Sequence, residues 1–246
     1  MALSILPIVG FPMISPGDDL AGAIASALAR QDIALRPTDV LVVAQKIVSK
    51  AEGRYLELAT LTPSSEAQRL AAITGKEARH VQAILDESER VVRAAPHLLL
   101  VRHRLGFVMA NAGIDQSNID DGTGDRVLLL PRDPDVSATA LRQALGAAII
   151  ISDSFGRPFR MGSVNVAIGA AGLPALIDRR GELDLNGRVL QTTEIAYADQ
   201  IASAAGLVIG EAAEGVPLAL VRGLGWSEAA RPAADLLRPV SSDRML

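Results

Sequence analysis

The chain of 246 residues contains no cysteine, and this absence removes several kinds of chemistry at once. Disulfides, thiol nucleophiles and thiolate metal ligands are excluded, so a metal site would have to use oxygen or histidine ligands. A chain without thiols suits a reducing compartment, and we expect a cytoplasmic location. The length is sufficient for a sizeable buried core without help from a structural metal.

Aromatic residues are scarce as well, at 3% of the chain, and the net charge is −4. A nucleic-acid partner is not expected, because the chain has neither a positive field for phosphates nor a stacking platform for bases. The longest apolar runs, such as 128–131 and 147–151, are far below the roughly 20 residues that cross a bilayer, so no membrane association is expected. The apolar start 1–14 lacks a cationic segment and is interrupted by proline and glycine, which argues against a signal peptide.

The hydrophobic pattern predicts an α+β fold with mixed and antiparallel sheets, in one region 1–246 without a clean internal boundary. Helical stretches are predicted to start at residue 62, to pause at Gly75 and to resume over 76–94 as a helical insert. A frayed tail is expected after Pro239. Further helices are predicted at 18–30, 137–145 and 194–205, and strands at 3–9, 39–45, 97–103, 107–111, 127–130, 147–151, 163–170, 182–189 (with a turn at Asn186-Gly187), 207–209 and 218–221.

Lysine is rare, and two of the three lysines lie in one short segment. Lys46 and Lys50 follow a predicted strand, Lys76 lies elsewhere, and the other 21 basic residues are arginine. Compact ammonium groups in such a place can contact nucleotide phosphates. The segment lacks the glycines of a Walker A loop, and chance clustering in an arginine-biased chain is the alternative interpretation.

Acidic and hydroxyl side chains follow predicted strands at two further places. Asp115 lies in the polar segment 111–118, and we expect Asp153 and Ser154 where the strand at 147–151 ends. Carboxylates delivered from two strands can share a hard cation such as Mg²⁺ or Mn²⁺ and leave positions for phosphate oxygens. Turn formation by solvated acids is the alternative.

Two other segments are candidates for binding anions or nucleotide. The acidic loop 210–215 is bounded by glycines, although a plain surface turn would look the same. Arg157 and Arg160 can clamp phosphate or carboxylate groups, and their alternative role is to lie along the surface in solvent.

Taken in order, these segments resemble the coenzyme F420-0:L-glutamate ligase family, also called the F420 gamma-glutamyl ligases. The similarity extends through almost the whole chain. It rests on Phe11-Pro12-Met13-Ile14, Gly17-Asp18-Asp19-Leu20, 48–54 (VSKAEGR), 111–118 (NAGIDQSN), Asp153-Ser154-Phe155-Gly156-Arg157, Ala167-Ile168-Gly169 and Val221-Arg222-Gly223-Leu224.

The resemblance implies GTP-dependent addition of L-glutamate to F420-0, a deazaflavin coenzyme precursor, in a homodimer. It also implies two ions of Mg²⁺ or Mn²⁺, with K⁺ as an optional further ion. The implied fold is a family-specific α+β arrangement of two intimately connected subdomains. Some bacterial members carry a fused C-terminal flavin-type domain, and we expect none in this chain.

The resemblance also assigns residues. Asp115 and Asp153 correspond to ligands of one metal, Ser154 and Glu211 to ligands of a second, and Asp115, Asp153 and Lys50 are the candidate catalytic residues. The chain departs from the family's pattern at three places: Ser154 stands where Thr is common, the 210–215 loop lacks a Gly-Gly pair of archaeal members that bears on the base pocket, and Gln45-Lys46 replaces a small hydroxylated pair of some members. The last departure leaves the nucleotide preference open. The implied nucleotide contacts are Phe11, Pro12, Met13, Ile14, Gln45, Lys46, Lys50, Asn118, Ile209, Gly210, Glu211, Ala212, Ala213, Glu214, Gly215 and Val216.

To form an amide from a carboxylate, one carboxylate oxygen must become a good leaving group. Phosphorylation to an acyl phosphate achieves this. Because the acceptor and glutamate are both anionic, we expect arginines in the acceptor site and choose Arg157 and Arg160. Two alternatives stay open. One is a related ligase with another carboxylate acceptor, and the other is a nucleotide-sensing protein without turnover.

Overall fold

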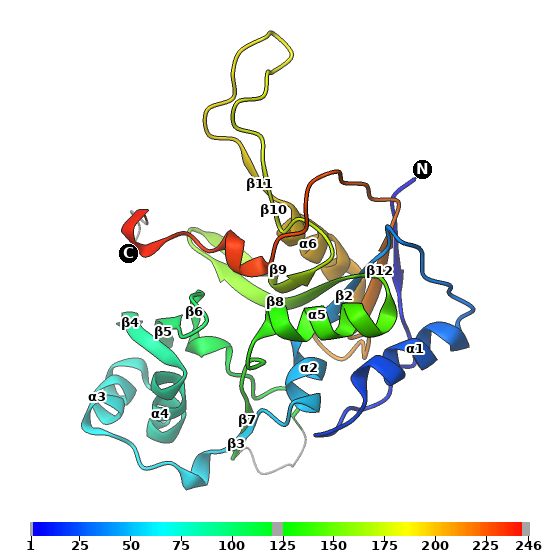
Figure 1. The fold of residues 1–246 in the computed structure, drawn as a ribbon. Helices are drawn as coiled ribbons and strands as arrows, with labels where there is room; N and C mark the ends of the chain where they lie inside the picture. The colour runs from blue at the N-terminus through cyan, green and yellow to red at the C-terminus, as the bar shows by residue number, and fades with distance from the viewer. Residues whose placement is uncertain (1, 120–124, 243–246) are drawn as a thin grey trace.

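The computed structural model describes residues 2–119 and 125–242, and its centre is a five-stranded mixed sheet (Figure 1). Strand β2 runs parallel to β8, and every other neighbouring pair is antiparallel, so β1, β2 and β8 all run in one direction. The edge at which these three strands approach their carboxyl ends is called the carboxyl edge below. The sheet order is β1 (Ser4–Pro7), β12 (Leu218–Arg222), β2 (Val40–Ala44), β8 (Ala148–Arg157) and β9 (Arg160–Ala171).

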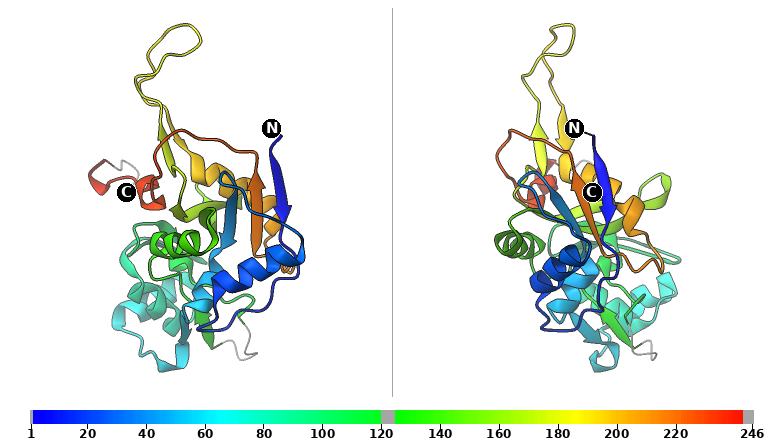
Figure 2. Two further views of the ribbon diagram at one scale, coloured as in Figure 1. Left: turned by 45° about the vertical axis from the view of Figure 1, so that its right-hand side comes forward. Right: turned by 90° about the vertical axis from the view of Figure 1, so that its right-hand side faces the viewer.

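Helices cover both faces of this sheet, as Figure 2 shows. Alternate residues of β2 and β8 belong to two separate cores, with Val43 and Ile151 on one face and Val42 and Ile150 on the other. This explains why these strands are continuous apolar runs in the sequence. Helices α1 (Leu20–Arg30) and α5 (Pro134–Leu145) pack on the first face, and α6 (Tyr197–Ile209) packs on the second.

A smaller unit has its own core and its own three-stranded antiparallel sheet. The short pair β3 (Tyr55–Glu57) and β7 (Arg126–Leu128) connects it to the main sheet. Its elements are η1 (Leu58–Thr60), α3 (Ser65–Thr74), α4 (Ala78–Asp86), β4 (Ser88–Ala95), β5 (Leu98–His103), β6 (Val108–Ala110) and η2 (Asn111–Gly113).

The predicted helix over 76–94 is wrong beyond Asp86. Residues Ser88–Ala95 form β4, which pairs with β5 through two register shifts. Val91 still packs on the smaller core, so its burial was predicted correctly, but it reaches that core from a strand. The non-local pairing with β5 overrides the helical spacing of the apolar residues.

Four other segments differ from the prediction. The 182–189 segment is no strand but part of an arm over 179–193, carried by the pair β10 (Leu176–Asp178) and β11 (Glu194–Ala196), and Gly187 takes positive φ at the predicted turn. Residues 194–196 are β11 and not helix, and 207–209 form the last turn of α6 and not a strand. Strand β8 continues through Asp153 to Arg157, so Asp153 does not lie at a strand end.

The remaining predicted strands and helices are confirmed within a few residues, and so is the α+β class. Among residues 2–119 and 125–242, no helix has the length and apolarity needed to cross a membrane. The chain ends in η3 (Ala233–Leu236) and η4 (Val240–Ser242). Residues 243–246 of the tail predicted to fray, and 120–124 of the polar loop, lie outside the described residues.

Candidate active site

Most of the predicted site segments lie at the carboxyl edge. The chain leaves β1 directly into the segment that contains Phe11–Ile14, and β2 continues without a loop into α2 (Gln45–Ala51). The loop 210–217 then leads into β12, whose first residue pairs with Val43 near the end of β2. In open sheets with parallel strands, ligands bind outside the carboxyl ends of those strands.

Helix α2 contributes polar side chains that are held by hydrogen bonds. The Gln45 amide donates to Asp115 Oδ2 at 2.8 Å and its oxygen accepts from Ser49 Oγ at 2.8 Å. Lys46 Nζ lies 3.5 Å from Asp115 Oδ1 and donates to Ser117 Oγ at 2.9 Å. Because Lys46 and Lys50 are four residues apart, both ammonium groups lie on one face of α2. The structure thus brings the lysine segment and Asp115 together, as predicted.

A strained turn places Asp115 in this position. Asn111, Ala112 and Gly113 take positive φ in succession, at 54°, 54° and 65°. A left-handed conformation at alanine costs on the order of 1–3 kcal/mol and persists only where the surrounding structure enforces it. The enforcement includes the backbone of Asp115, which exchanges two hydrogen bonds of 2.9 Å with Leu128.

The polar loop also contacts the acidic loop 210–217. The Lys50 ammonium donates to the carbonyl of Asn118 at 2.8 Å, and the Asn118 amide donates to the carbonyl of Ala212 at 3.2 Å. Gly210 takes a φ of 76°, and a Cβ there would lie 2.3 Å from the Glu214 side chain, so this position requires glycine. The loop is therefore tied through Asn118 to the polar segment that Lys50 of α2 holds, a specific contact that a plain surface turn does not need.

Negative charge is concentrated here. Burial, together with the nearby charges of Asp115 and Glu211, raises the pKa of Asp153 to about 7, although the Ser154 N–H and Lys46 oppose this shift. Burial also raises the pKa of Asp115, although Lys46 and Gln45 oppose that shift. A cluster of carboxylates that resist ionisation is characteristic of functional sites, because a bound cation can relieve the repulsion.

The donor chemistry of these residues fits a hard divalent cation, because carboxylate and hydroxyl oxygens are the ligands that Mg²⁺ and Mn²⁺ prefer. Within the described ranges, no three His, Asp or Glu side chains are already gathered as a ligand set, and Asp115 is instead bonded to Gln45 and Lys46. Asp153 and Ser154 are consecutive in β8 and therefore point to opposite faces of the sheet. Ser154 shares its face with its cross-strand partner Asn165, whose amide lies against Gly206 of α6.

The other predicted residues come from the 11–14 segment and from the β8–β9 hairpin. Phe11 and Ile14 pack on the core, whereas Met13 is 75% exposed. Arg157 and Arg160 lie at the tip of the β8–β9 hairpin, and Arg157 donates to the carbonyl of Met161 at 3.4 Å. Arg157 is four residues beyond Asp153, about 13 Å along an extended strand. The structure does not bring these two arginines into the cluster.

Two contributors were missed from the sequence. Ser117 accepts from Lys46, and its place inside the polar segment 111–118 was the available signal. Arg54 follows α2, donates to the carbonyl of Leu130 at 2.8 Å and pairs with Glu87 at 2.9 Å. No local pattern reveals the Arg54–Glu87 pair, because the two residues are 33 positions apart in the chain.

The carboxyl edge of this mixed sheet carries lysine ammonium groups that can donate to phosphate, together with a cluster of acids. This arrangement is typical of α+β proteins that bind nucleotides or phosphate. Comparison with known families is consistent with this class. Residues 9–223 match the model of the family described as F420-0:Gamma-glutamyl ligase. The chain belongs to this family of enzymes, and the resemblance seen in its motifs is confirmed.

Curated relatives agree over nearly the full length. A protein named Coenzyme F420:L-glutamate ligase from Methanothermobacter thermautotrophicus is 46% identical over 251 residues, covering 99% of this chain and 98% of the relative. A protein of the same name from Methanopyrus kandleri is 45% identical, covering 94% of this chain and 92% of the relative. The one from Archaeoglobus fulgidus is 44% identical, with 91% and 89% covered.

Proposed function

We propose that this protein uses GTP to join L-glutamate to F420-0 through an acyl phosphate, with two Mg²⁺ or Mn²⁺ ions and K⁺ as an optional further ion. The observation that carries the proposal is the hydrogen-bonded convergence of Lys46, Lys50, Asp115 and the 210–217 loop at the carboxyl edge. The names of the relatives support glutamate and F420 as the reactants. The nucleotide and the metals are supported by the donor types alone.

The reaction needs two displacements. An oxygen of the acceptor carboxylate attacks the γ-phosphorus of GTP, a C–O–P linkage forms, and GDP leaves. The glutamate amine then attacks the acyl carbon, the bond from carbon to the phosphate oxygen breaks, and inorganic phosphate leaves as the amine loses a proton. No side chain has to become covalently modified.

The residues of α2 serve binding and charge neutralisation in this scheme. Lys46 and Lys50 donate to loop oxygens, and phosphate oxygens of the nucleotide can replace these acceptors. Asp115 and Asp153 would hold one divalent ion, and Ser154 and Glu211 a second. Such ions, when bound, neutralise charge that develops on the transferred phosphoryl group.

The test is mass spectrometry of F420-0 after incubation with protein, glutamate, GTP and Mn²⁺, with each component omitted in turn. A gain of one or more glutamyl units that depends on all components supports the proposal and gives the number of glutamates added. ATP in place of GTP tests the nucleotide preference. If GTP binds but no mass is gained, the proposal is wrong, and the sensor or a ligase with another acceptor takes its place.

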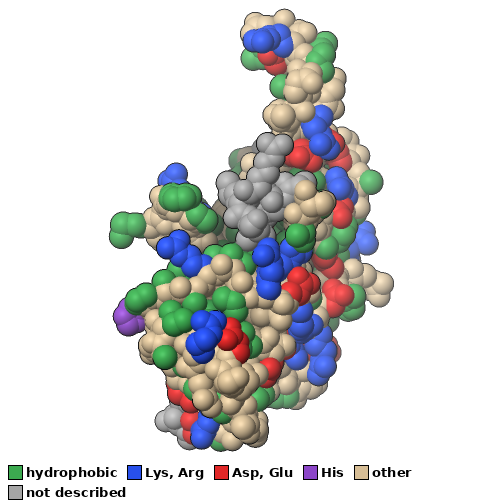
Figure 3. All heavy atoms as spheres, turned by 90° about the vertical axis from the view of Figure 1, so that its left-hand side faces the viewer, with side chains coloured by type: hydrophobic (Ala, Val, Ile, Leu, Met, Phe, Trp, Pro, Cys, Tyr) green, Lys and Arg blue, Asp and Glu red, His purple; other side chains and the backbone are tan. Residues whose placement is uncertain are grey.

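We further propose a cytoplasmic homodimer, and the support for the dimer is the arm 179–193. The arm projects from the body and mixes hydrophobic with charged side chains at its end (Figure 3). Leu185 is fully exposed, and Leu183 and Val189 are 66% and 51% exposed. Apolar groups gathered on a projection are typical of contacts with another chain. Light scattering should give twice the 25.8 kDa chain mass, and Leu185→Asp should lower it.

A further inference from the structure

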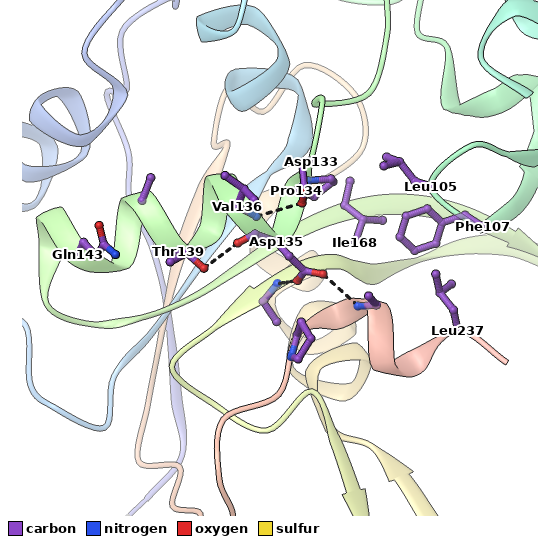
Figure 4. Close-up of a pocket in the computed structure, with 14 residues that line it drawn as sticks. Leu105, Phe107, Asp133, Pro134, Asp135, Val136, Thr139, Gln143, Ile168 and Leu237 are labelled. Atoms are coloured by element: carbon purple, nitrogen blue, oxygen red, sulfur yellow. Dashed lines mark hydrogen bonds between the residues drawn. The ribbon is translucent and has the colours of Figure 1, made fainter. Parts of the chain in front are cut away.

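A groove of about 550 Å³ lies outside the cluster just described, along α5 (Figure 4). Its walls come from α5, from β9, from the turn between β5 and β6, and from η3 with the residues around it. Apolar side chains line much of it, namely Leu105, Phe107, Val136, Ile168 and Leu237. We call this cavity the α5 groove, and its volume is within the range of small-molecule sites.

The α5 groove adjoins the candidate active site. Ile168 of its wall lies in β9 between Ala167 and Gly169, which pair with Ser152 and Ile151 of β8. Asp153 is the next residue of β8 and pairs with Val166, two residues before Ile168, so it lies diagonally across the sheet from this wall, roughly 7–8 Å away. Phe155, two residues further, shares the core with Ile151 and Ile168. Asp153 therefore faces the same side of the sheet as the groove.

Close packing holds the groove open beside the site. Gly169 has no side chain, and a Cβ there would lie 2.3 Å from the carbonyl oxygen of Pro134, so α5 begins directly against β9. On the side toward Asp153, Phe107 meets Phe155 edge to face, with ring centroids 6.0 Å apart. This contact fixes one wall of the groove to the strand that carries Asp153.

The charge of the groove selects its ligand. None of the described residues that line it is Lys or Arg, so it offers no cationic side chain to an anionic group. Both acidic side chains of the groove accept hydrogen bonds from backbone N–H groups: Asp133 from Val136, and Asp135 from Ala170 and Ala233. An apolar, uncharged and planar group fits such a lining, whereas phosphate and carboxylate groups belong near Lys46 and Lys50.

We propose that the α5 groove binds the deazaflavin ring of the acceptor, with the anionic tail passing Phe107 toward Asp153. This assignment rests on the proposed function, because it presumes a deazaflavin acceptor. It separates the two ends of that molecule: the ring lies on α5 and β9, and the reacting carboxylate lies at the carboxyl edge.

The test measures ring binding directly, through the fluorescence of the deazaflavin, without turnover. Val136 is 63% exposed and Ala140 is also exposed, and both line the groove from one face of α5, so tryptophan at either position fills the groove without entering the core. F420-0 titrated into Val136→Trp and Ala140→Trp should bind at least about 10-fold more weakly than into wild type. Affinity for GTP should stay unchanged in both.

Two controls keep the outcomes distinct. Ile73→Trp places the same residue on α3, at a position 39% exposed and outside the groove, and should bind F420-0 like wild type. A deazaflavin without the anionic tail should bind wild type and lose affinity in Val136→Trp. If both groove variants bind F420-0 and the tailless ring as wild type does, the groove assignment is wrong while the ligase function stands. If wild type neither binds nor ligates F420-0, the proposed function fails with it.

Discussion

Two partly buried groups of charged side chains in this molecule shift the pKa of a carboxylate in opposite directions. At the carboxyl edge, burial and the charge of Asp115 raise the pKa of Asp153 to about 7. In the second group, burial would raise the pKa of Glu87, but His103, Arg54 and Arg104 lower it to about 2. Arg54 lies 2.9 Å and Arg104 3.1 Å from the same Glu87 oxygen. Compensated charges are typical of a group that stabilises the fold, whereas excess buried negative charge is what the proposed metal site requires.

One short motif supplies both groups. In the segment VSKAEGR, Lys50 reaches the polar loop of the site. Glu52 instead accepts from the Arg132 N–H at 2.9 Å and from Ser137 Oγ at 2.6 Å, which ties the end of α2 to the start of α5. Arg54 joins the Glu87 group. The motif therefore divides between Lys50, the proposed nucleotide contact, and Glu52 and Arg54, which make structural contacts.

The largest expected effect follows from neutralising the excess charge. Asp153→Asn should lower ligation by about 10³-fold or more, since it removes a group that acts on charge developing in the transition state. The fold should survive, because repulsion with Asp115 is relieved. Glutamyl transfer measured by mass spectrometry and thermal unfolding measure the two effects separately. Asp86→Asn, at an exposed residue whose carboxylate accepts from the Gln82 amide at 2.7 Å, is the matched control and should leave both unchanged.

Glu87→Gln should have the opposite profile. Removing the shared carboxylate leaves Arg54 and Arg104 uncompensated, and Arg54 is only 12% exposed, so unfolding free energy should fall by about 3 kcal/mol. Denaturant titration measures this loss. Glu182→Gln breaks an exposed pair with Arg179 and should cost less than about 1 kcal/mol. Equal losses in the two variants would show that the Glu87 group is not a structural centre.

The two carboxylates should also give stability slopes of opposite sign with pH. The pKa of Glu87 falls from 4.5 unfolded to about 2 folded, so its stabilisation is present above pH 4.5 and is lost as the pH falls toward 2. The pKa of Asp153 rises from 3.8 to about 7, so its contribution is present below pH 4 and is lost as the pH rises toward 7. Denaturation of the metal-free protein across this range should show both slopes. Glu87→Gln should lack the first slope, and Asp153→Asn the second.

Local sequence patterns pointed to most of the segments that meet in the candidate site, because each segment is short and is tied to one strand. Lys46 lies in the first turn of α2 directly after β2, and Asp153 lies in β8, so their approach follows once these two strands are parallel neighbours. The hydrophobic pattern predicted the wrong secondary structure where pairing between segments distant in the chain decides it. Val91 fits a helical face by spacing, yet it pairs with Val101 in a sheet.

The Glu87 group and the α5 groove had no sequence signal for the same reason. The partners of Glu87 come from the ends of α2 and β5, and the groove joins residues from Leu105 to Leu237. Such sites depend on side chains that meet only after the two units of the fold have packed. Spacing along the chain cannot indicate them.

The smallest expected effect distinguishes the lysines. Lys46→Met removes one charged contact to the nucleotide, so GTP affinity should fall by about 10-fold, or about 1.4 kcal/mol. The same change removes the cation bonded to Asp115, so Mn²⁺ without nucleotide should bind at least as tightly as to wild type. Lys76→Met, in the connection between α3 and α4, controls for the loss of a lysine and should change neither value. Calorimetric titration gives both affinities. Weaker Mn²⁺ binding to Lys46→Met would show that Lys46 supports the acidic cluster and does not compete with a metal for Asp115.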